Sequence, residues 1–188
     1  MGQVLLHLVR HGRPQIQPGR AASTWQLDPS ANTEEMHRLR SLLEDRAPTA
    51  AWFSSDEPKA VATARLLTTG PVRVLPALRE AHRSDWFETH EEFRAVVLDA
   101  FSRPDLPARP GWEPLDQTRR RISEAVVQLV GQESDDLVLV GHGTAWTLLI
   151  SEITGREPDL NAWTRLRTPD LCILDLGTQT ISHRWGRL

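Results

Sequence analysis

The chain has 188 residues, a length that suits one domain with a core large enough to fold unaided. Its hydrophobic content of 39% and charged content of 25% are those of a soluble globular protein, and a formal net charge of −3 gives no reason to expect nucleic-acid binding. No apolar run approaches a membrane span and the N-terminus lacks a signal-peptide pattern, so we expect a cytoplasmic protein without membrane contact. Cys172 is the single cysteine, which excludes an internal disulfide.

The first predicted element is a short apolar run from Val4 to Val9 that ends at Arg10, His11 and Gly12. Runs this short and rich in Val and Leu are typical of a strand buried on both faces of a parallel sheet. Gly12 would permit a sharp turn after it. Because open α/β sheets bind ligands beyond the carboxyl ends of their strands, the pattern predicts an anion site with a cation and a possible nucleophile.

The following elements alternate between helices and strands. A loop over 15–32 precedes a helix that Asn32 or Thr33 could cap and that ends before Pro48. The sequence then predicts strands over 50–53, 72–75 and 137–140, helices over 90–102 and 115–130, a helix that includes 145–150, and closing strands over 171–176 and 180–185. One of the closing segments is expected to supply an antiparallel edge strand.

Two later segments carry further candidate site residues. Lys59, the only lysine, lies in the first turn of a helix that begins after a short strand, where a cation can reach an anion held at the helix entrance. His142 lies between two glycines at the end of the fourth strand, and the N–H groups of the next helix would also favour an anion. The simplest structural interpretations are a solvated surface lysine and a capping histidine.

Four segments together resemble, in chain order, the motifs of the histidine phosphatase superfamily, which has the phosphoglycerate mutase-like fold. They are L-V-R-H-G, the stretch from Ser54 to Ala64, L-R-E ending at Glu80 with Trp86 after it, and G-H-G around His142. The resemblance covers most of the chain. It implies a three-layer α/β/α sandwich with a mostly parallel sheet and an antiparallel edge strand. Lys59 replaces the arginine of the second motif. This replacement keeps the positive charge but loses the bidentate hydrogen bonding of a guanidinium to phosphate.

The resemblance also implies a function. It implies a phosphatase that hydrolyses a phosphate monoester of a small metabolite or a phosphoprotein through a phosphohistidine on His11. Glu80 would protonate the leaving group, with Asp85 and Glu88 as competing carboxyls. The residues expected to bind the phosphoryl group are Arg10, Gly12, Arg13, Lys59 and His142.

We expect neither a metal nor another cofactor. On a strand, His7 and His11 lie about 13 Å apart at about 3.3 Å per residue, too far to share one ion. No other group of Cys, His or carboxylate residues has metal-ligand spacing.

The segment 82–115 is interpreted as a small insertion over the rim of the site, within a single domain over 1–188. Loops at such rims usually determine substrate selectivity. The segment contains four candidate substrate contacts, although ordinary surface positions are the simpler interpretation: His82, Arg83, His90 and Trp112.

Two alternatives to a phosphatase remain open. A phosphoglycerate-type mutase is disfavoured because Gly-Arg-Pro follows His11 where those mutases resemble R-H-G-E-S. The chain also has only a compact insertion to exclude water from a phosphoenzyme. A catalytically silent module that binds an anion or a partner has Lys59 as its only support.

Overall fold

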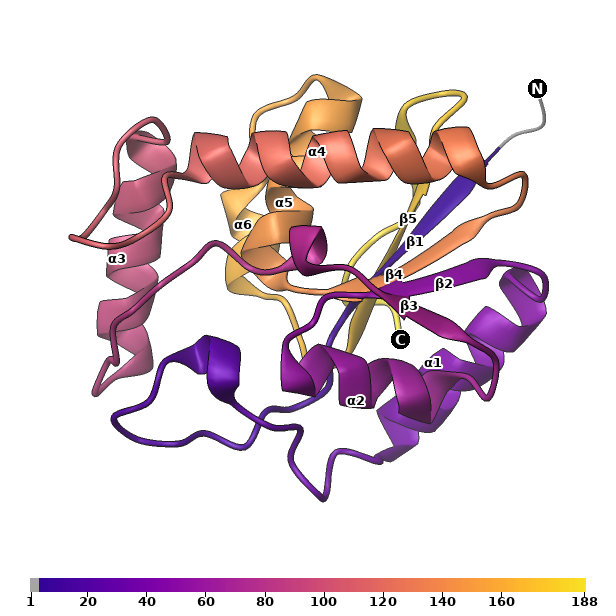
Figure 1. The fold of residues 1–188 in the computed structure, drawn as a ribbon, viewed down its shortest axis with the longest axis horizontal. Helices are drawn as coiled ribbons and strands as arrows, with labels where there is room; N and C mark the ends of the chain where they lie inside the picture. The colour runs from indigo at the N-terminus through magenta and orange to yellow at the C-terminus, as the bar shows by residue number, and fades with distance from the viewer. Residues whose placement is uncertain (1–3) are drawn as a thin grey trace.

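A computed structural model describes residues 4–188, with a six-stranded sheet at its centre in the order β3-β2-β4-β1-β5-β6 (Figure 1). The strands are β1 (Leu5–Arg10), β2 (Ala51–Ser54), β3 (Val72–Val74), β4 (Leu137–Gly141), β5 (Asp170–Asp175) and β6 (Thr180–His183). The first four are parallel, whereas β5 pairs antiparallel with both β1 and the edge strand β6. The predicted mixed sheet with antiparallel pairing at one edge is confirmed.

The helices cover both faces of this sheet. They are α1 (Glu34–Arg46), α2 (Pro58–Leu67), α3 (His90–Ser102), α4 (Leu115–Gln132), α5 (Gly143–Thr154) and α6 (Leu160–Thr164), with short 3-10 turns η1 (Ala22–Thr24) and η2 (Pro76–Leu78). In Figure 1, α4 and α5 lie on one side of the sheet and α1 and α2 on the other, which confirms the three-layer sandwich. Within residues 4–188 no helix combines the length and apolarity needed to cross a bilayer.

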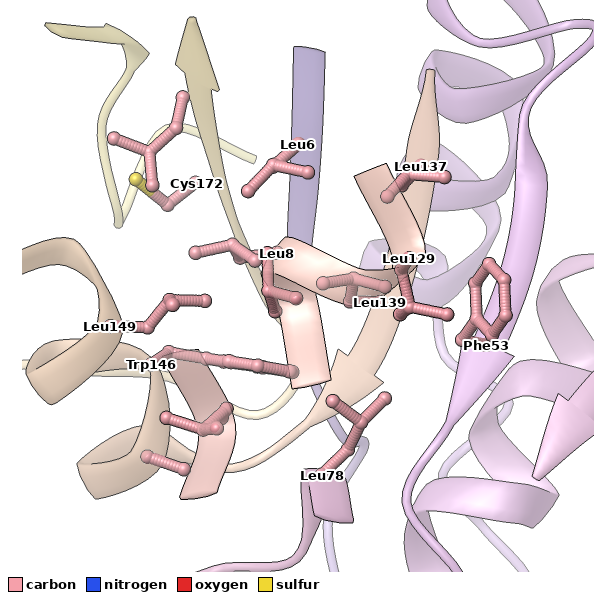
Figure 2. Packing of buried hydrophobic residues seen from close by; sticks show 14 residues of the cluster. Leu6, Leu8, Phe53, Leu78, Leu129, Leu137, Leu139, Trp146, Leu149 and Cys172 are labelled. Carbon is pink, nitrogen blue, oxygen red and sulfur yellow. The ribbon is translucent and has the colours of Figure 1, made fainter. Parts of the chain in front are cut away.

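Alternate residues of the central strands bury two separate cores. Leu6 and Leu8 of β1 pack with α4 and α5 around Trp146, as Figure 2 shows, whereas Val9 packs with α1 and α2. In β4, residues 137 and 139 face the first core and residues 138 and 140 the second. Both faces of these strands are therefore buried, which explains their nearly unbroken apolar runs.

Local contacts set the ends of the elements that lead to the site. Thr33, rather than Asn32, caps α1, because its hydroxyl accepts a hydrogen bond from Met36 N at 3.4 Å. His142 is the residue that precedes α5, which begins at Gly143, two residues earlier than the predicted run. The other predicted elements differ from the observed ones by one or two residues at their ends.

Two glycines are required for space at the strand ends. Gly12 is not among the described glycines with positive φ, so the expected turn conformation is not its role. A Cβ there would lie 2.7 Å from Met36 Cε, and one at Gly141 would lie 2.5 Å from the Trp146 ring. The missing side chains let α1 and α5 pack directly against the ends of β1 and β4.

The segment 82–115 contains α3, which stands beyond the end of the sheet in Figure 1. It packs through small apolar clusters of its own rather than through the two main cores. In these clusters Ala100 meets Leu148 of α5, and Val97 meets Trp112 and Trp163.

Candidate active site

A cavity of about 1350 Å³ opens where three parallel strands end. His11 N donates to Gly141 O at 3.0 Å, and Ser55 N donates to Val140 O at 3.0 Å, so the residues after β1, β2 and β4 are held side by side. The cavity lining includes the five residues on which the sequence analysis placed most of the chemistry: Arg10, His11, Lys59, Glu80 and His142. Segments far apart in the chain therefore converge on one site.

His11 is buried with its ring held by its neighbour's backbone. Its Nδ1 lies 2.7 Å from Gly12 O. A carbonyl oxygen can only accept, so Nδ1 carries the proton and Nε2 keeps its lone pair. Burial lowers the pKa of His11 well below its ordinary value, and His142, Lys59 and Arg10 lower it further. The ring is thus a neutral imidazole whose Nε2 has a free lone pair, as a nucleophile requires.

His142 lies beside His11, with the ring centroids 5.3 Å apart. Its Nε2 is 2.7 Å from Ser55 Oγ and 3.5 Å from a carboxylate oxygen of Glu57. Burial and the positive charge of Lys59 lower the pKa of His142 to about 3, although Glu80 acts in the opposite direction. Both histidines are therefore neutral near pH 7 in the unliganded site.

Arg10 is fixed by the backbone that leads into β5. Its Nη1 donates to Leu166 O at 2.8 Å and to Arg167 O at 3.3 Å. The Nε of Arg10 is a buried donor with no protein partner, and an anion is a suitable acceptor for it. A Cβ at Gly143 would lie 3.0 Å from Leu166 Cδ1, so the glycine lets α5 begin close to the segment that binds Arg10.

Lys59 is buried, so its interpretation as a solvated surface residue is wrong. Its Nζ donates to Ala22 O at 2.7 Å and forms an ion pair with Glu57. Glu57 also accepts a hydrogen bond from Glu80 N at 3.1 Å. Sequence reasoning missed Glu57, and its available signal was an acidic residue two positions before the only lysine, at a helix entrance.

Glu80 is bound at the N-terminus of α5. Its carboxylate accepts hydrogen bonds from Thr144 N at 3.0 Å, Ala145 N at 2.8 Å and Ala81 N at 3.0 Å. Burial raises the pKa of Glu80, but Arg83, His142 and the backbone N–H groups outweigh it, and the pKa lies below its ordinary value. The group is therefore a carboxylate in the unliganded site.

The competing carboxyls have other partners. Asp85 accepts a hydrogen bond from Trp112 Nε1 at 3.0 Å, and Glu88 accepts one from Trp86 Nε1 at 3.1 Å. Both line the cavity, but only Glu80 is bound at the helix that follows His142. The geometry therefore favours Glu80 among the three.

Arg83 is the second site residue that sequence reasoning undervalued. Its Nη2 donates to Thr144 Oγ1 at 2.8 Å, which places a cation beside the helix start that binds Glu80. His82, His90 and Trp112 line the cavity as well, so all four candidate contacts of segment 82–115 reach its surface.

Gly12 and Arg13, which were expected to bind the phosphoryl group, have protein partners in this structure. The amide of Gly12 is already used, because it donates to Thr63 Oγ1 at 2.9 Å. The Arg13 side chain is 57% exposed and bound to Asp28 at 3.2 Å and to Ser30 at 2.5 Å. Neither residue is part of the cavity lining, although Pro14 and Ile16 of the same loop are.

No group of three His, Cys, Asp or Glu side chains within residues 4–188 lies close enough together to hold a metal ion.

The comparisons with known proteins agree with this fold. The family model of the histidine phosphatase superfamily (branch 1) matches residues 6–185, and the chain belongs to this superfamily. No curated protein matches the chain. Two phosphatases have similar structures: a mycobacterial glucosyl-3-phosphoglycerate phosphatase (23% identity, 98% of this chain and 96% of that one, TM-score 0.74) and a phosphoserine phosphatase mutant from Entamoeba histolytica (18%, 90% and 89%, 0.70). YhfR from Bacillus stearothermophilus is 25% identical over 96% of each chain, with a TM-score of 0.74.

Proposed function

We propose that the protein is a metal-independent phosphatase that hydrolyses a phosphate monoester through a phosphohistidine on His11. The observation that carries the proposal is the hydrogen bond from His11 Nδ1 to Gly12 O, which leaves Nε2 unprotonated inside a cavity lined by cations. Membership of the histidine phosphatase superfamily and the structural similarity to two phosphatases support the same class of reaction.

In the first step, Nε2 of His11 attacks phosphorus in line and the ester oxygen leaves. Negative charge on the equatorial oxygens is stabilised by Arg10, which the backbone already orients, and by Lys59. His142 takes part as a neutral ring that can donate one hydrogen bond. A bound dianion beside it favours its protonated form and can convert it to a cation.

Glu80 is proposed to give a proton to the leaving oxygen and then to remove one from the attacking water. Its pKa is low in the unliganded site, so it must be raised when substrate binds. A phosphoryl dianion nearby has that effect, because it disfavours a second negative charge. The second step transfers the phosphoryl group to water and regenerates neutral His11.

One observation favours the silent binding module as a second candidate. Lys59 is ion-paired with Glu57, so part of its charge is compensated before any phosphate binds. A mutase has no comparable support, since Arg13, which follows Gly12, is turned away from the cavity.

The test is turnover of an aryl phosphate with and without a chelator, combined with acid-labile labelling of the protein by a ³²P ester. In the wild-type protein we expect turnover and labelling both with and without the chelator. In His11→Ala we expect turnover and labelling to be lost. His37→Ala is the matched control, because His37 is exposed on α1. Binding of the ester without turnover or labelling would favour the silent module.

A further inference from the structure

The cavity is much larger than a phosphoryl group requires. Pockets for drug-sized ligands typically measure about 300–1,000 Å³, and this one measures about 1350 Å³. The proposed chemistry uses only the end lined by Arg10, His11, Lys59, Glu80 and His142. The rest of the cavity is available for the group that carries the phosphate.

Aromatic side chains line this remaining part. We call them the aromatic wall; its members are Trp25, Trp86, Phe87, Phe93 and Trp112. Trp25 comes from the loop after β1 and meets Trp86 edge to face, with the ring centroids 5.9 Å apart. Phe87 meets Phe93 at 5.6 Å and Trp112 at 5.9 Å. The loop after β1 and the segment 82–115, which includes α3, thus both contribute rings to this part of the cavity.

The indoles offer ring surface rather than hydrogen bonds. Trp25 Nε1 donates to Arg20 O at 3.1 Å, Trp86 Nε1 to Glu88 and Trp112 Nε1 to Asp85. Each indole N–H is therefore satisfied by the protein itself, and the rings are held in place. A ligand meets their faces and edges, which suit flat apolar groups.

Charged residues near the wall are largely paired with one another. Arg79 forms a two-pronged ion pair with Asp56, and Arg121 is bound to Glu113 at 2.8 Å. These two arginines are therefore already occupied by protein carboxylates and are not available to a charged substituent of the ligand.

Arg83 connects the wall to the proposed proton donor. Its guanidinium carbon lies 5.2 Å from the Phe93 ring centroid and 5.5 Å from that of Trp112. The same guanidinium donates to Thr144, whose amide is bound to Glu80. A leaving oxygen within reach of Glu80 consequently begins next to the wall.

We propose that the substrate is a phosphate monoester of an alcohol that carries a planar aromatic or heteroaromatic ring, and that this ring packs against the aromatic wall. The proposal rests on the proposed phosphatase function and adds to it the class of leaving group.

The experiment compares kcat/KM for esters that all release a primary alcohol: methyl, cyclohexylmethyl and benzyl phosphate, and glucose 6-phosphate. Burying one aromatic ring should raise kcat/KM of benzyl over methyl phosphate by about ten- to a hundredfold. The planar benzyl ester should also exceed the cyclohexylmethyl ester several-fold. Equal values for benzyl and methyl phosphate would overturn the proposal, as would the highest value for glucose 6-phosphate.

Variants of the aromatic wall test whether the wall causes the preference for benzyl over methyl phosphate. Trp86→Ala should reduce the benzyl-to-methyl ratio at least about fivefold, and Trp86→Phe should restore most of it because a ring remains. Trp185→Ala is the matched control, since Trp185 packs on the core outside the cavity. An unchanged ratio in Trp86→Ala would contradict the assignment of the wall.

A binding measurement separates this inference from the proposed function. Benzylphosphonate should bind about ten- to a hundredfold more tightly than methylphosphonate, whether or not esters are hydrolysed. Tighter binding without turnover of any ester would refute the phosphatase and support an aromatic ligand. Equal affinities would overturn the aromatic ligand even in an active enzyme.

Discussion

The two parts of the cavity, the strand-end residues and the aromatic wall, are kept in position by different contacts. Arg10 is the last residue of β1, and His11 and His142 directly follow the ends of the adjacent strands β1 and β4; backbone groups bind Arg10 and His11 directly. The aromatic wall consists of side chains from the loop after β1 and from the segment 82–115, and these side chains meet mainly through ring contacts. The strand-end residues depend on the sheet for their position, whereas the wall depends on loops that can vary independently. Reaction and selectivity are therefore separable in this molecule, and mutations should separate them.

The largest expected effect is at the strand ends. His11→Ala removes the proposed nucleophile, so kcat/KM should fall by more than about 10³-fold for every ester. Acid-labile labelling in a quench experiment should disappear with it. Labelling that persists in this variant would place the nucleophile elsewhere in the cavity.

Glu80→Gln should have the next largest effect, because it removes the proton donor and acceptor. Esters with poor leaving groups should lose about 10²- to 10⁴-fold in kcat/KM. Aryl phosphates should lose much less, since a phenolate needs little protonation. Steady-state rates with benzyl and p-nitrophenyl phosphate measure the contrast. Equal losses would point to Asp85 or Glu88.

Lys59→Ala should affect both rate and stability. Loss of one preorganised cation should cost about a hundredfold in kcat/KM. Glu57 would also remain buried without its ion-pair partner, which should lower the free energy of unfolding by about 3–5 kcal/mol. Lys59→Arg should keep most activity, since the charge remains.

A matched double variant tests the ion pair itself. Glu57→Gln combined with Lys59→Ala should be more stable in urea unfolding than Lys59→Ala alone, because no buried charge is left unpaired. A stable Lys59→Ala with wild-type kcat/KM would remove this lysine from the site.

The strand-end histidines also predict a dependence of stability on pH. Burial is the main cause of the lowered pKa of His11 and His142 in the folded protein. After unfolding, both regain a pKa near 6.5 and take up protons below that pH. Their contribution to stability is therefore complete above about pH 6.5 and is lost as the pH falls toward the folded pKa.

The free energy of unfolding should fall by at most about 1.4 kcal/mol per pH unit for each of the two histidines. Urea unfolding at pH 7.5, 6.0 and 5.0 measures this change of the free energy of unfolding with pH. The change should be smaller in His142→Gln. A wild-type free energy of unfolding that stays constant over this range would contradict neutral buried histidines.

The smallest effect is expected at Arg13. Its side chain lies outside the cavity, so Arg13→Ala should change kcat/KM by less than about twofold. Arg10→Ala, with the same change of charge, should cost about a hundredfold or more. A large rise in KM for Arg13→Ala would support the prediction from the sequence that Arg13 binds the phosphoryl group.

Residues near the ends of predicted strands could be assigned to the site from the sequence. Apolar runs buried on both faces identified β1 and β4, and the residue after each run had to lie at the same sheet edge. This reasoning placed His11 and His142 in one cavity, and the family resemblance added Glu80 and Lys59. Local order in the chain was therefore enough for the two histidines, whereas Glu80 and Lys59 required the resemblance.

Glu57 and Arg83 could not be assigned in that way. The position of Glu57 depends on contacts with Lys59, His142 and the amide of Glu80, which only the folded chain brings together. Arg83 acquires its place through Thr144, 61 positions away. Arg13 lies next to a motif, but adjacency to a motif does not decide which way a loop residue points, and its side chain is paired with Asp28.

Trp146 links the ends of β1 and β4, in addition to filling the hydrophobic core. Its indole donates to Val9 O at 2.9 Å and its ring covers Gly141, so one fully buried side chain touches the ends of both β1 and β4. The spacing of the two histidines is thus a property of the hydrophobic core. Heat inactivation should coincide with loss of the whole fold, without a partly melted form that still turns over. Over evolutionary time, descendants of such a fold can replace the loops around the cavity and acquire new substrates while inheriting the same pair of histidines.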